Sequence, residues 1–281
     1  MGMKREDVII GLLSACSVRL DTDAGPQGTA FFVAPGYAVT AAHVIGGAAG
    51  LPVQLAGGPD VWRGCVAAVR PPAGSEIAVA SPYPAPDVAL IRIDDGPGHE
   101  CALLGRKFPH LGVRAVAHGH TRTFDRLSVT AETETFLLAG TLETPDPGCR
   151  LLKLGQGEVA LGMSGAPVLE LRTGKVIGML RTSRQLGSDL GGWVVPADLI
   201  RALWPQEVGL GNDRFHEDSR WRREASQLRA RQRPKDSTPG QGSPAVGKVI
   251  ADVAPVITGG TIGVVNIDYS PQSRRRGPGT R

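Results

Sequence analysis

The feature that most constrains this chain is a histidine, an acid and a serine that stand in three separate motifs. The motifs are Thr40-Ala41-Ala42-His43, Pro86-Asp87-Val88 and Gly162-Met163-Ser164-Gly165-Ala166-Pro167. Asp87 follows His43 by 44 residues, and Ser164 follows Asp87 by 77. A serine hydroxyl becomes a good nucleophile when an imidazole takes its proton and a carboxylate orients that imidazole. The fold must therefore bring three distant segments together.

A high content of turn-forming residues indicates the fold class. The 281 residues include 38 glycines and 22 prolines, well above the usual combined share of about 12%. Alternating or apolar runs predict strands at 16–20, 28–33, 37–40, 65–70, 76–80 and 88–93 in the first half. Further runs predict strands at 113–118, 127–132, 136–141, 150–154, 168–171, 176–182 and 193–195. The sequence thus predicts an all-β protein with a short helix at 196–204.

The three motifs, in this order, resemble those of chymotrypsin-like serine peptidases (the trypsin superfamily), in particular the short intracellular bacterial forms. The resemblance covers residues 14–204. It implies two antiparallel β-barrels of the six-stranded type followed by a C-terminal helix. His43 and Asp87 belong to the first barrel and Ser164 to the second, so the catalytic cleft is expected at the seam between the barrels.

The resemblance also implies a role for each motif residue. His43 is the general base, Asp87 orients its ring, and Ser164 is the nucleophile. Gly162 permits a sharp turn that points the backbone N–H groups of Gly162 and Ser164 into an oxyanion hole. Met163 replaces the aspartate that secreted digestive relatives have before the serine, so activation through a newly cut N-terminus is not expected.

Substrate-binding residues are expected around the nucleophile. Glu158 falls where trypsin-like members keep an acid at the base of the primary pocket, which indicates a preference for basic residues before the scissile bond. Glu158 can equally be a surface loop acid. The resemblance places Arg181, Thr182 and Ser183 beside the substrate backbone and Gly192 in a pocket wall. Arg181 has an alternative, which is to pair with Glu158 and close the pocket.

Other side chains offer alternatives to this assignment. Asp94 and Asp95 are fallback candidates for the acid, although they lie past the strand. His118 and His120 share one face of a predicted strand and could suit a metal ion, but no third ligand stands near them in the sequence. We therefore expect neither a metal site nor a cofactor.

The composition changes beyond residue 205. We expect a peptidase domain at 1–205, a basic helical extension at 206–233, a Pro/Gly/Ser linker at 234–245 and a flexible, basic, β-prone tail at 246–281. In the extension, Trp221, Ala225 and Leu228 have helical spacing and predict an apolar stripe that docks or self-associates. Residues 209–211, Gly-Leu-Gly, resemble the carboxylate-binding loop of PDZ modules, but the basic, helical residues after them do not suit a PDZ fold.

The tail carries a motif of its own. Residues 261–267, Thr-Ile-Gly-Val-Val-Asn-Ile, loosely resemble amyloid-forming signalling motifs of the RHIM type. An uncharged β-prone segment on a tether can stack in register with copies of itself. We expect residues 246–281 to serve self-assembly or contact a signalling partner. A strand that docks back on the peptidase and a merely disordered tail remain as alternatives.

Charge and cysteine usage limit partners and compartment. Residues 211–281 carry 13 Lys and Arg against 7 acids, whereas residues 1–210 carry 18 against 20. A basic end suits an anionic partner or a solvated surface, and we expect no specific nucleic acid. Four dispersed cysteines, Cys16, Cys65, Cys101 and Cys149, favour free thiols in the cytoplasm. Residues 13–16 resemble a lipoprotein cleavage site after a short apolar run. No segment is apolar enough to span a bilayer.

These observations lead to one main functional expectation and two alternatives. The chain is expected to be a serine endopeptidase that cleaves protein or peptide substrates, recruited by its tail as an effector of a bacterial antiviral defence or cell-death system. The first alternative is a housekeeping protease of HtrA type without a PDZ domain. The second is a catalytically silent protease fold that acts as an adaptor.

Overall fold

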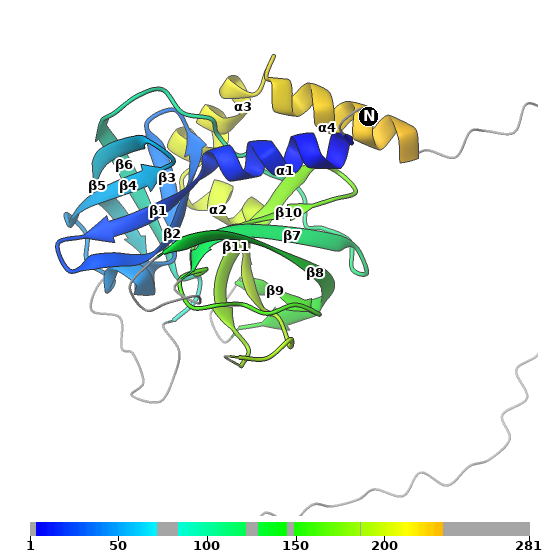
Figure 1. The fold of residues 1–281 in the computed structure, drawn as a ribbon, viewed down its shortest axis with the longest axis horizontal. Helices are drawn as coiled ribbons and strands as arrows, with labels where there is room; N and C mark the ends of the chain where they lie inside the picture. The colour runs from blue at the N-terminus through cyan, green and yellow to red at the C-terminus, as the bar shows by residue number, and fades with distance from the viewer. Residues whose placement is uncertain (1–3, 72–83, 122–128, 145–148, 186, 233–281) are drawn as a thin grey trace, which may run out of the picture. The chain divides into compact units, whose positions relative to one another are not determined.

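The computed structural model of the chain describes residues 4–71, 84–121, 129–144, 149–185 and 187–232 (Figure 1). The predicted strand 76–80, the linker 234–245 and the tail 246–281 lie outside the described residues. The chain divides into a compact unit, Met1–Lys235, and a second unit, Asp236–Arg281. The bounds of the first unit include both the predicted peptidase domain, 1–205, and the whole of the predicted helical extension, 206–233.

The first unit begins its sheet structure with a closed antiparallel barrel. Its strands are β1 (Ser17–Thr22), β2 (Gly25–Ala34), β3 (Tyr37–Thr40), β4 (Pro52–Gly57), β5 (Asp60–Arg70) and β6 (Val88–Asp95), in the spatial order β1-β2-β3-β6-β5-β4. Side chains that alternate along these strands fill the barrel, among them Leu20, Phe32, Leu55 and Ile91. Period-two burial of this kind is what an antiparallel barrel requires.

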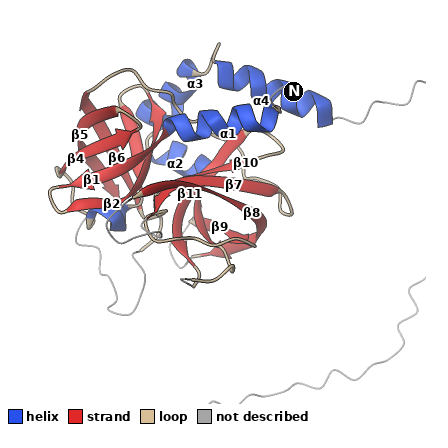
Figure 2. Cartoon of the chain, in the orientation of Figure 1, coloured by secondary structure: helices blue, strands red, loops and turns tan. Residues whose placement is uncertain are grey.

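A second closed antiparallel barrel follows. It consists of β7 (Arg114–Thr121), β8 (Thr130–Glu143), β9 (Arg150–Gly155), β10 (Pro167–Glu170), β11 (Lys175–Ser183) and β12 (Gly192–Pro196), in the order β10-β11-β12-β9-β8-β7. Its interior is a separate cluster that includes Phe136, Leu152, Val168 and Ile177. The predicted all-β fold of two six-stranded barrels is confirmed, as the two groups of strands in Figure 2 show.

Two strand predictions were wrong. Strand β4 was not predicted, although Val53 and Leu55 alternate with exposed neighbours as in a half-buried strand. The predicted strands 127–132 and 136–141 are parts of a single long strand, β8, over its described residues. The polar stretch between them stays in the sheet because the first half of β8 pairs with β7 and the second half with β9.

Helical segments connect and flank the two barrels. They are α1 (Arg5–Cys16), the short turn η1 (Ala42–Ile45), α2 (Ala197–Leu203), η2 (Pro205–Leu210), α3 (Gly211–Phe215) and α4 (Arg220–Gln232). Helix α2 confirms the helix predicted at 196–204. Helix α1 was not predicted, since its apolar run was interpreted only as a weak leader segment. Residues 209–211 lie in the helical segments η2 and α3, in agreement with the expectation that they do not form a PDZ loop.

Helices α1 and α4 lie side by side (Figure 1), joined by an ion pair of 2.7 Å between Arg5 Nη1 and Glu224 Oε2. The predicted stripe of Trp221, Ala225 and Leu228 is buried against the peptidase core. Trp221 also donates its indole N–H to the carbonyl of Gly174, at the turn between β10 and β11. The stripe therefore docks, and it is not available for self-association.

The start of the described chain is packed into the core. Cys16, the last residue of α1, is fully buried, and its thiol donates to the carbonyl of Leu13. Burial raises the pKa of the Cys16 thiol well above its usual value. In this folded state Cys16 is therefore a residue of the core.

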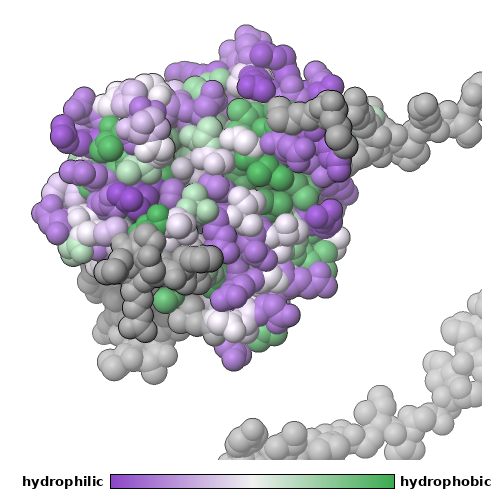
Figure 3. Space-filling model, viewed as in Figure 1, coloured by the Kyte–Doolittle hydropathy of each residue, from purple (hydrophilic) through white to green (hydrophobic). Residues whose placement is uncertain are grey.

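The surface of the described part of the chain is mixed in polarity on the side that Figure 3 shows. Hydrophilic residues cover much of the face seen in Figure 3, and hydrophobic residues gather around α1. Among the helices in the described part of the chain, none is both long and apolar enough to cross a bilayer.

Candidate active site

His43 lies in η1, immediately after strand β3, and is held by a buried acid. Its Nδ1 lies 2.8 Å from Asp87 Oδ2, and its backbone N–H donates to Asp87 Oδ1 over 2.9 Å. An ionised carboxylate can only accept hydrogen bonds, so Nδ1 carries the proton and Nε2 keeps a free lone pair. The His43 side chain is 33% exposed while that of Asp87 is 1% exposed. The free nitrogen therefore belongs to a ring that solvent reaches.

Asp87 stands just before strand β6 in a left-handed backbone conformation, with φ of 59°. Aspartate tolerates this region better than most residues. The carbonyl of Asp87 accepts the N–H of Ala42, which fixes the loop against the residue before His43. Backbone and side chain of Asp87 thus both bind the His43 segment.

A third donor reaches the same carboxylate. Arg181, near the end of β11, donates its Nε–H to Asp87 Oδ2 over 3.0 Å, and the two side chains are 8% and 1% exposed. A buried carboxylate is costly unless an opposite charge and hydrogen bonds replace its water. Arg181 provides that charge from the second barrel, so the acid of the first barrel is held across the seam.

Ser164 lies in the turn before β10, tied to the first barrel by its backbone. Its carbonyl accepts the N–H of Thr29 over 3.0 Å, and the Thr29 hydroxyl donates to the carbonyl of Gly162 over 2.9 Å. A Cβ placed on Gly28 would lie 3.1 Å from the Ser164 carbonyl oxygen and 3.0 Å from Val44, the residue after His43. The serine loop and the histidine turn therefore both lie against Gly28 of β2 and are close neighbours.

The ring and the hydroxyl are not joined in this structure. Both Ser164 and His43 are described residues, and no hydrogen bond links the Ser164 hydroxyl to the His43 ring. Catalytic hydrogen bonds are often long in enzymes without substrate and shorten when substrate binds. Ser164 is half-buried, so its hydroxyl remains open to a ligand.

Glycines make the sharp turn around Ser164 possible. Gly162 has φ of 98°, and a Cβ there would lie 2.4 Å from the carbonyl oxygen of His120. Gly165 has φ of 91°, and a Cβ there would lie 1.9 Å from the carbonyl oxygen of Thr29. Only glycine fits at either position, because both the conformation and the space exclude a side chain.

The turn leaves two amide groups free. The N–H of Met163 donates to the carbonyl of Ala160, and that of Gly165 donates to the carbonyl of Leu180. The N–H groups of Gly162 and Ser164 have no acceptor among the described residues. Two unpaired amides on either side of one residue form a ready site for a negative oxygen.

Comparison with known protein families shows which family has this sequence pattern. The sequence model of a family described as the trypsin-like peptidase domain matches residues 28–179, a segment that contains His43, Asp87 and Ser164. The chain belongs to the trypsin-like peptidase family. A search of the curated proteins found no match.

Solved structures of trypsin-like peptidases share the fold. The Rv3671c protease from M. tuberculosis in its active form is similar with a TM-score of 0.51 and 20% identity, over 72% of this chain and 84% of that one. The HtrA-type protease AlgW with a decapeptide gives 0.54 and 16%, over 73% and 68%. The serine endoprotease from Yersinia pestis gives 0.55 and 14%, over 74% and 68%. At these identities the likeness concerns the fold.

Four of the five residues expected to bind substrate lie near one another, namely Thr182, Ser183, Gly192 and Glu158. Ser183 pairs with Gly192 and Thr182 with Trp193 in the β11–β12 ladder. A Cβ on Gly192 would lie 2.6 Å from the Thr182 carbonyl oxygen and 3.0 Å from Val159, the residue after Glu158. Glu158 itself is exposed.

Arg181 departs from the sequence-based expectation. Its guanidinium binds Asp87 and not Glu158, so the predicted alternative in which it closes the pocket against Glu158 is wrong. The physical reason is burial, because Asp87 is the more deeply buried acid and loses more free energy if its charge is left unpaired.

Glu134 is the acid near this region of the peptidase that sequence reasoning missed. It lies on β8, close enough to Glu158 for the backbone N–H of Glu158 to favour the charged form of its carboxyl. Burial and the charge of Glu132 raise the pKa of the Glu134 carboxyl. The alternation of acids at 132 and 134 was visible in the sequence, but nothing there indicated that β8 passes beside residue 158.

Of the two histidines considered for a metal, His118 has other partners, whereas the Nε2 atom of His120 is buried without a hydrogen-bond partner among the described residues. His118 Nε2 lies 3.1 Å from Ser14 Oγ, and its Nδ1 lies 2.7 Å from Thr133 Oγ1. Burial, with the nearby His118 charge, lowers the pKa of His120 to about 4. The described residues contain no group of three or more His, Cys, Asp or Glu side chains that could hold a metal ion.

Proposed function

We propose that this chain is a serine endopeptidase in which His43, Asp87 and Ser164 act as a catalytic triad. The observation that carries the proposal is the buried carboxylate of Asp87, which binds both the ring and the backbone of His43. A histidine fixed in this way, beside a glycine-flanked serine loop, is the arrangement that activates a serine hydroxyl.

The reaction follows from the fixed tautomer. His43 Nε2 takes the Ser164 proton as Oγ attacks the substrate carbonyl, and Asp87 stabilises the imidazolium that forms. The ring then gives the proton to the leaving amine, which leaves an acyl group on Ser164. A water molecule, deprotonated by His43 in turn, releases the acid product and restores the hydroxyl.

The free amides of Gly162 and Ser164 form the oxyanion hole in this mechanism. They bind the negative oxygen of each tetrahedral intermediate without having to break a bond to another acceptor first. Loss of one such donor typically costs about 3 kcal/mol of transition-state stabilisation. The glycine at 162 is needed because no other residue keeps that amide in place.

Arg181 is a positioning residue in this mechanism, acting through Asp87. Its guanidinium compensates the buried carboxylate and fixes the oxygen that bonds His43 Nδ1. Asp87 is then held from both barrels, so the relative placement of the barrels sets the orientation of the imidazole ring.

Acids near the expected primary pocket favour basic substrates. Glu158 and Glu134 lie close together beside the segment that contains Val159 and Gly192. Two neighbouring carboxylates attract a Lys or Arg side chain more strongly than either does alone. We propose cleavage after basic residues, tested by a peptide-library cleavage profile with Glu158→Gln as the variant that loses the preference.

An activity-based probe tests the triad directly. A fluorophosphonate should label the full chain at Ser164, and the label should disappear in Ser164→Ala and fall strongly in His43→Ala. Ser188→Ala, which removes a half-buried hydroxyl that donates to the carbonyl of Gln185 and belongs to none of the motifs, is the matched control and should label normally. Labelling that persists in Ser164→Ala would place the nucleophile elsewhere and defeat the proposal.

A silent adaptor is the second candidate, favoured by the missing hydrogen bond between Ser164 and His43. The same probe separates it from the enzyme. A folded protein that neither labels nor cleaves any library peptide would support the adaptor. Stoichiometric labelling at Ser164 would dismiss it.

We further propose a cytoplasmic protein whose tail at 246–281 recruits or clusters it as an effector of bacterial antiviral defence. The free thiols of Cys16, Cys65 and Cys101, of which Cys16 and Cys101 are buried, suit a reducing compartment. Deleting residues 246–281 should leave labelling at Ser164 intact but reduce the assembly size in light scattering. An unchanged size would remove the assembly role. The HtrA-type structures keep a quality-control protease as the alternative role, which cleavage of unfolded proteins by the tail-deleted chain would favour.

A further inference from the structure

A cavity of about 330 Å³ lies on the helical side of the molecule, where four separate parts of the chain meet. Leu103, Leu104 and Arg106 come from the segment that joins the barrels, and Lys175 begins strand β11. Asp213 comes from α3, and α4 contributes Arg222, Ala225, Ser226 and Arg229. The cavity is within the range usual for small-molecule sites, though at its lower end.

The lining is strongly cationic. Four of its side chains are basic and one is acidic. Asp213, the acid, is already occupied, because it forms ion pairs of 2.8 Å with Arg201 and 2.9 Å with Arg106. These two arginines lower the pKa of Asp213 against the effect of its burial. The single negative charge is thus shared by two cations and leaves none for the others.

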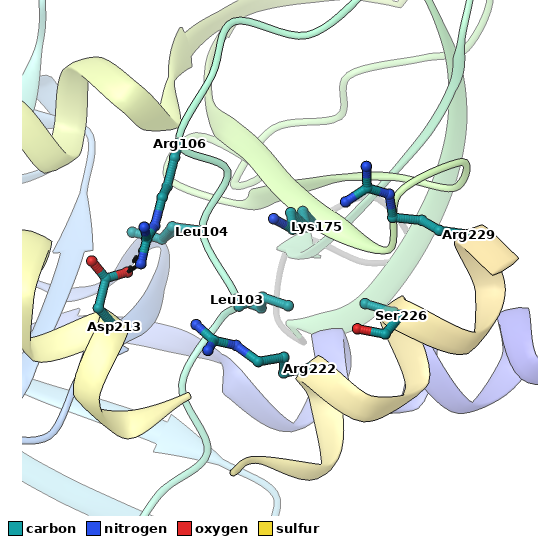
Figure 4. Close-up of a pocket in the computed structure, with 9 residues that line it drawn as sticks. Leu103, Leu104, Arg106, Lys175, Asp213, Arg222, Ser226 and Arg229 are labelled. Carbon is teal, nitrogen blue, oxygen red and sulfur yellow. Dashed lines mark hydrogen bonds and ion pairs between the residues drawn. The ribbon is translucent and has the colours of Figure 1, made fainter. Parts of the chain in front are cut away.

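Three cations of the cavity have no counter-charge. Within the described residues, no ion pair or hydrogen bond engages the side-chain nitrogens of Lys175, Arg222 or Arg229. Burial lowers the pKa of Lys175, and the charges of Arg229, Arg106 and Arg222 lower it further. Figure 4 shows the charged ends of Lys175 and Arg222 facing the same hollow, with Arg106 beside them. The fold holds like charges together here at a cost in free energy.

A multivalent anion removes that cost. Phosphate groups suit the site because arginine forks and a lysine ammonium are the side chains that bind phosphate oxygens best. Leu103, Leu104 and Ala225 add apolar surface to the same cavity, which can contact an organic group. We propose that the cavity is a binding site for a small phosphorylated organic molecule, held by Lys175, Arg222 and Arg229.

Such a ligand fastens α4 to the peptidase body. Lys175 belongs to the second barrel and the two arginines belong to α4, so an anion between them bridges side chains that otherwise repel one another. Arg181 lies six residues further along β11, about 20 Å away at the usual rise of a strand. The ligand therefore does not contact the proposed catalytic residues. Whether the cavity binds it can be tested independently of the peptidase reaction.

Calorimetric titration of the full chain with inorganic pyrophosphate tests the charge. At constant ionic strength we expect saturable binding to one site, weakened about tenfold or more in Lys175→Met and in Arg222→Gln, since each loses a charge-assisted hydrogen bond. Arg220→Gln is the matched control, because it removes an exposed arginine of α4 that does not line the cavity. It should change the affinity less than about twofold. If Lys175→Met fails to fold, Arg222→Gln and Arg229→Gln carry the test.

Phenyl phosphate tests the organic part. It should bind several-fold more tightly than inorganic phosphate, because the ring covers Leu103 and Leu104. Equal affinities would remove the organic group from the proposal. Pyrophosphate binding that is no stronger than that of sulfate, or that falls equally in Arg220→Gln and Arg222→Gln, would overturn the site, since the attraction would then be general to the basic helix.

Discussion

Strand β11 carries two partly or fully buried cations, and their surroundings differ in one decisive way. Arg181, near its end, meets the buried carboxylate of Asp87 over 3.0 Å. Lys175, at its start, faces three arginines and an acid that is already paired. Net charge is balanced at one end and left positive at the other. The balanced end is suited to hold a catalytic geometry rigidly, whereas the unbalanced end is suited to receive a ligand.

A third buried basic group needs no counter-charge, because its pKa is low enough to keep it neutral. His216, after α3, is fully buried, with Nδ1 2.7 Å from Ser219 Oγ. Burial, helped by the charge of Arg222, lowers its pKa from the usual 6.5 to about 4. The three sites therefore differ in how the positive charge is compensated. Arg181 is paired with a carboxylate, Lys175 has no counter-charge without a bound anion, and His216 is neutral.

The largest effect is expected where the paired charge orients the histidine. Asp87→Asn should lower kcat/KM by about 10⁴-fold, because the amide no longer enforces the tautomer with Nδ1 protonated. Cleavage of a fluorogenic peptide measures it. Asp94→Asn is the control, since Asp94 is half exposed and pairs only with Arg92 across the surface. A variant at Asp94 that lost as much activity would show that the wrong acid had been assigned.

Replacing Arg181, the partner of Asp87 in the buried ion pair, should mainly lower the stability of the protein. Arg181→Met leaves Asp87 buried beside a neutral imidazole and should lower the free energy of unfolding by about 3–5 kcal/mol in urea denaturation. The double variant with Asp87→Asn should recover part of that loss without recovering activity. Arg63→Met, which breaks an exposed pair of 3.6 Å with Asp95, is the control and should cost less than about 1 kcal/mol. Equal losses in the two single variants would contradict a special role for the buried pair.

The neutral base predicts acid sensitivity. The unfolded chain binds a proton at position 216 near pH 6.5 while the folded chain resists it until about pH 4. Stability should therefore be complete above pH 6.5 and fall as the pH drops towards 4, by on the order of 3 kcal/mol for this group. His120 titrates in the same window, so His216→Met should show a shallower decline than wild type and not a flat one. Parallel pH profiles would show that His216 is not held neutral.

The smallest effect on stability is expected at the Lys175 end of β11, where removing a charge should stabilise the protein and not destabilise it. In low salt and without phosphate, Arg229→Gln should leave stability unchanged or raise it by up to about 1 kcal/mol, because it relieves repulsion at an exposed position. Added salt should erase the difference by screening. A clear loss of stability in this variant would mean that Arg229 has a counter-charge after all, and the contrast between the two ends of β11 would disappear.

The sequence predicted the elements that short motifs or regular spacing of apolar residues specify. The barrels followed from alternation, and the docking stripe of α4 followed from the helical spacing of Trp221, Ala225 and Leu228. Helix α1 was missed because apolar residues occur on all of its faces, so the stripe that is buried, Ile9, Leu12, Leu13 and Cys16, gave no periodic signal in the sequence. The single strand β8 was missed because its polar middle, Thr133 to Thr135, is in a ladder that only the neighbouring strands reveal.

The charge relationships could not be read from the sequence at all. Arg181 follows Asp87 by 94 residues, and only the closure of the two barrels brings them together. The cationic cavity likewise joins four distant segments that share no motif. Local patterns specify elements, whereas pairing of buried charges depends on how those elements pack.

The central claim is that His43 and Ser164 act on one substrate from the two sides of the seam. A peptidyl chloromethyl ketone with a basic residue tests this most directly, because its ketone adds to the serine while its methylene alkylates the histidine. Peptide mapping by mass spectrometry should find the alkylated residue at His43, with a rate that falls sharply in Ser164→Ala. Alkylation of Cys65 alone, or of His43 at the same rate with and without the serine hydroxyl, would contradict the account.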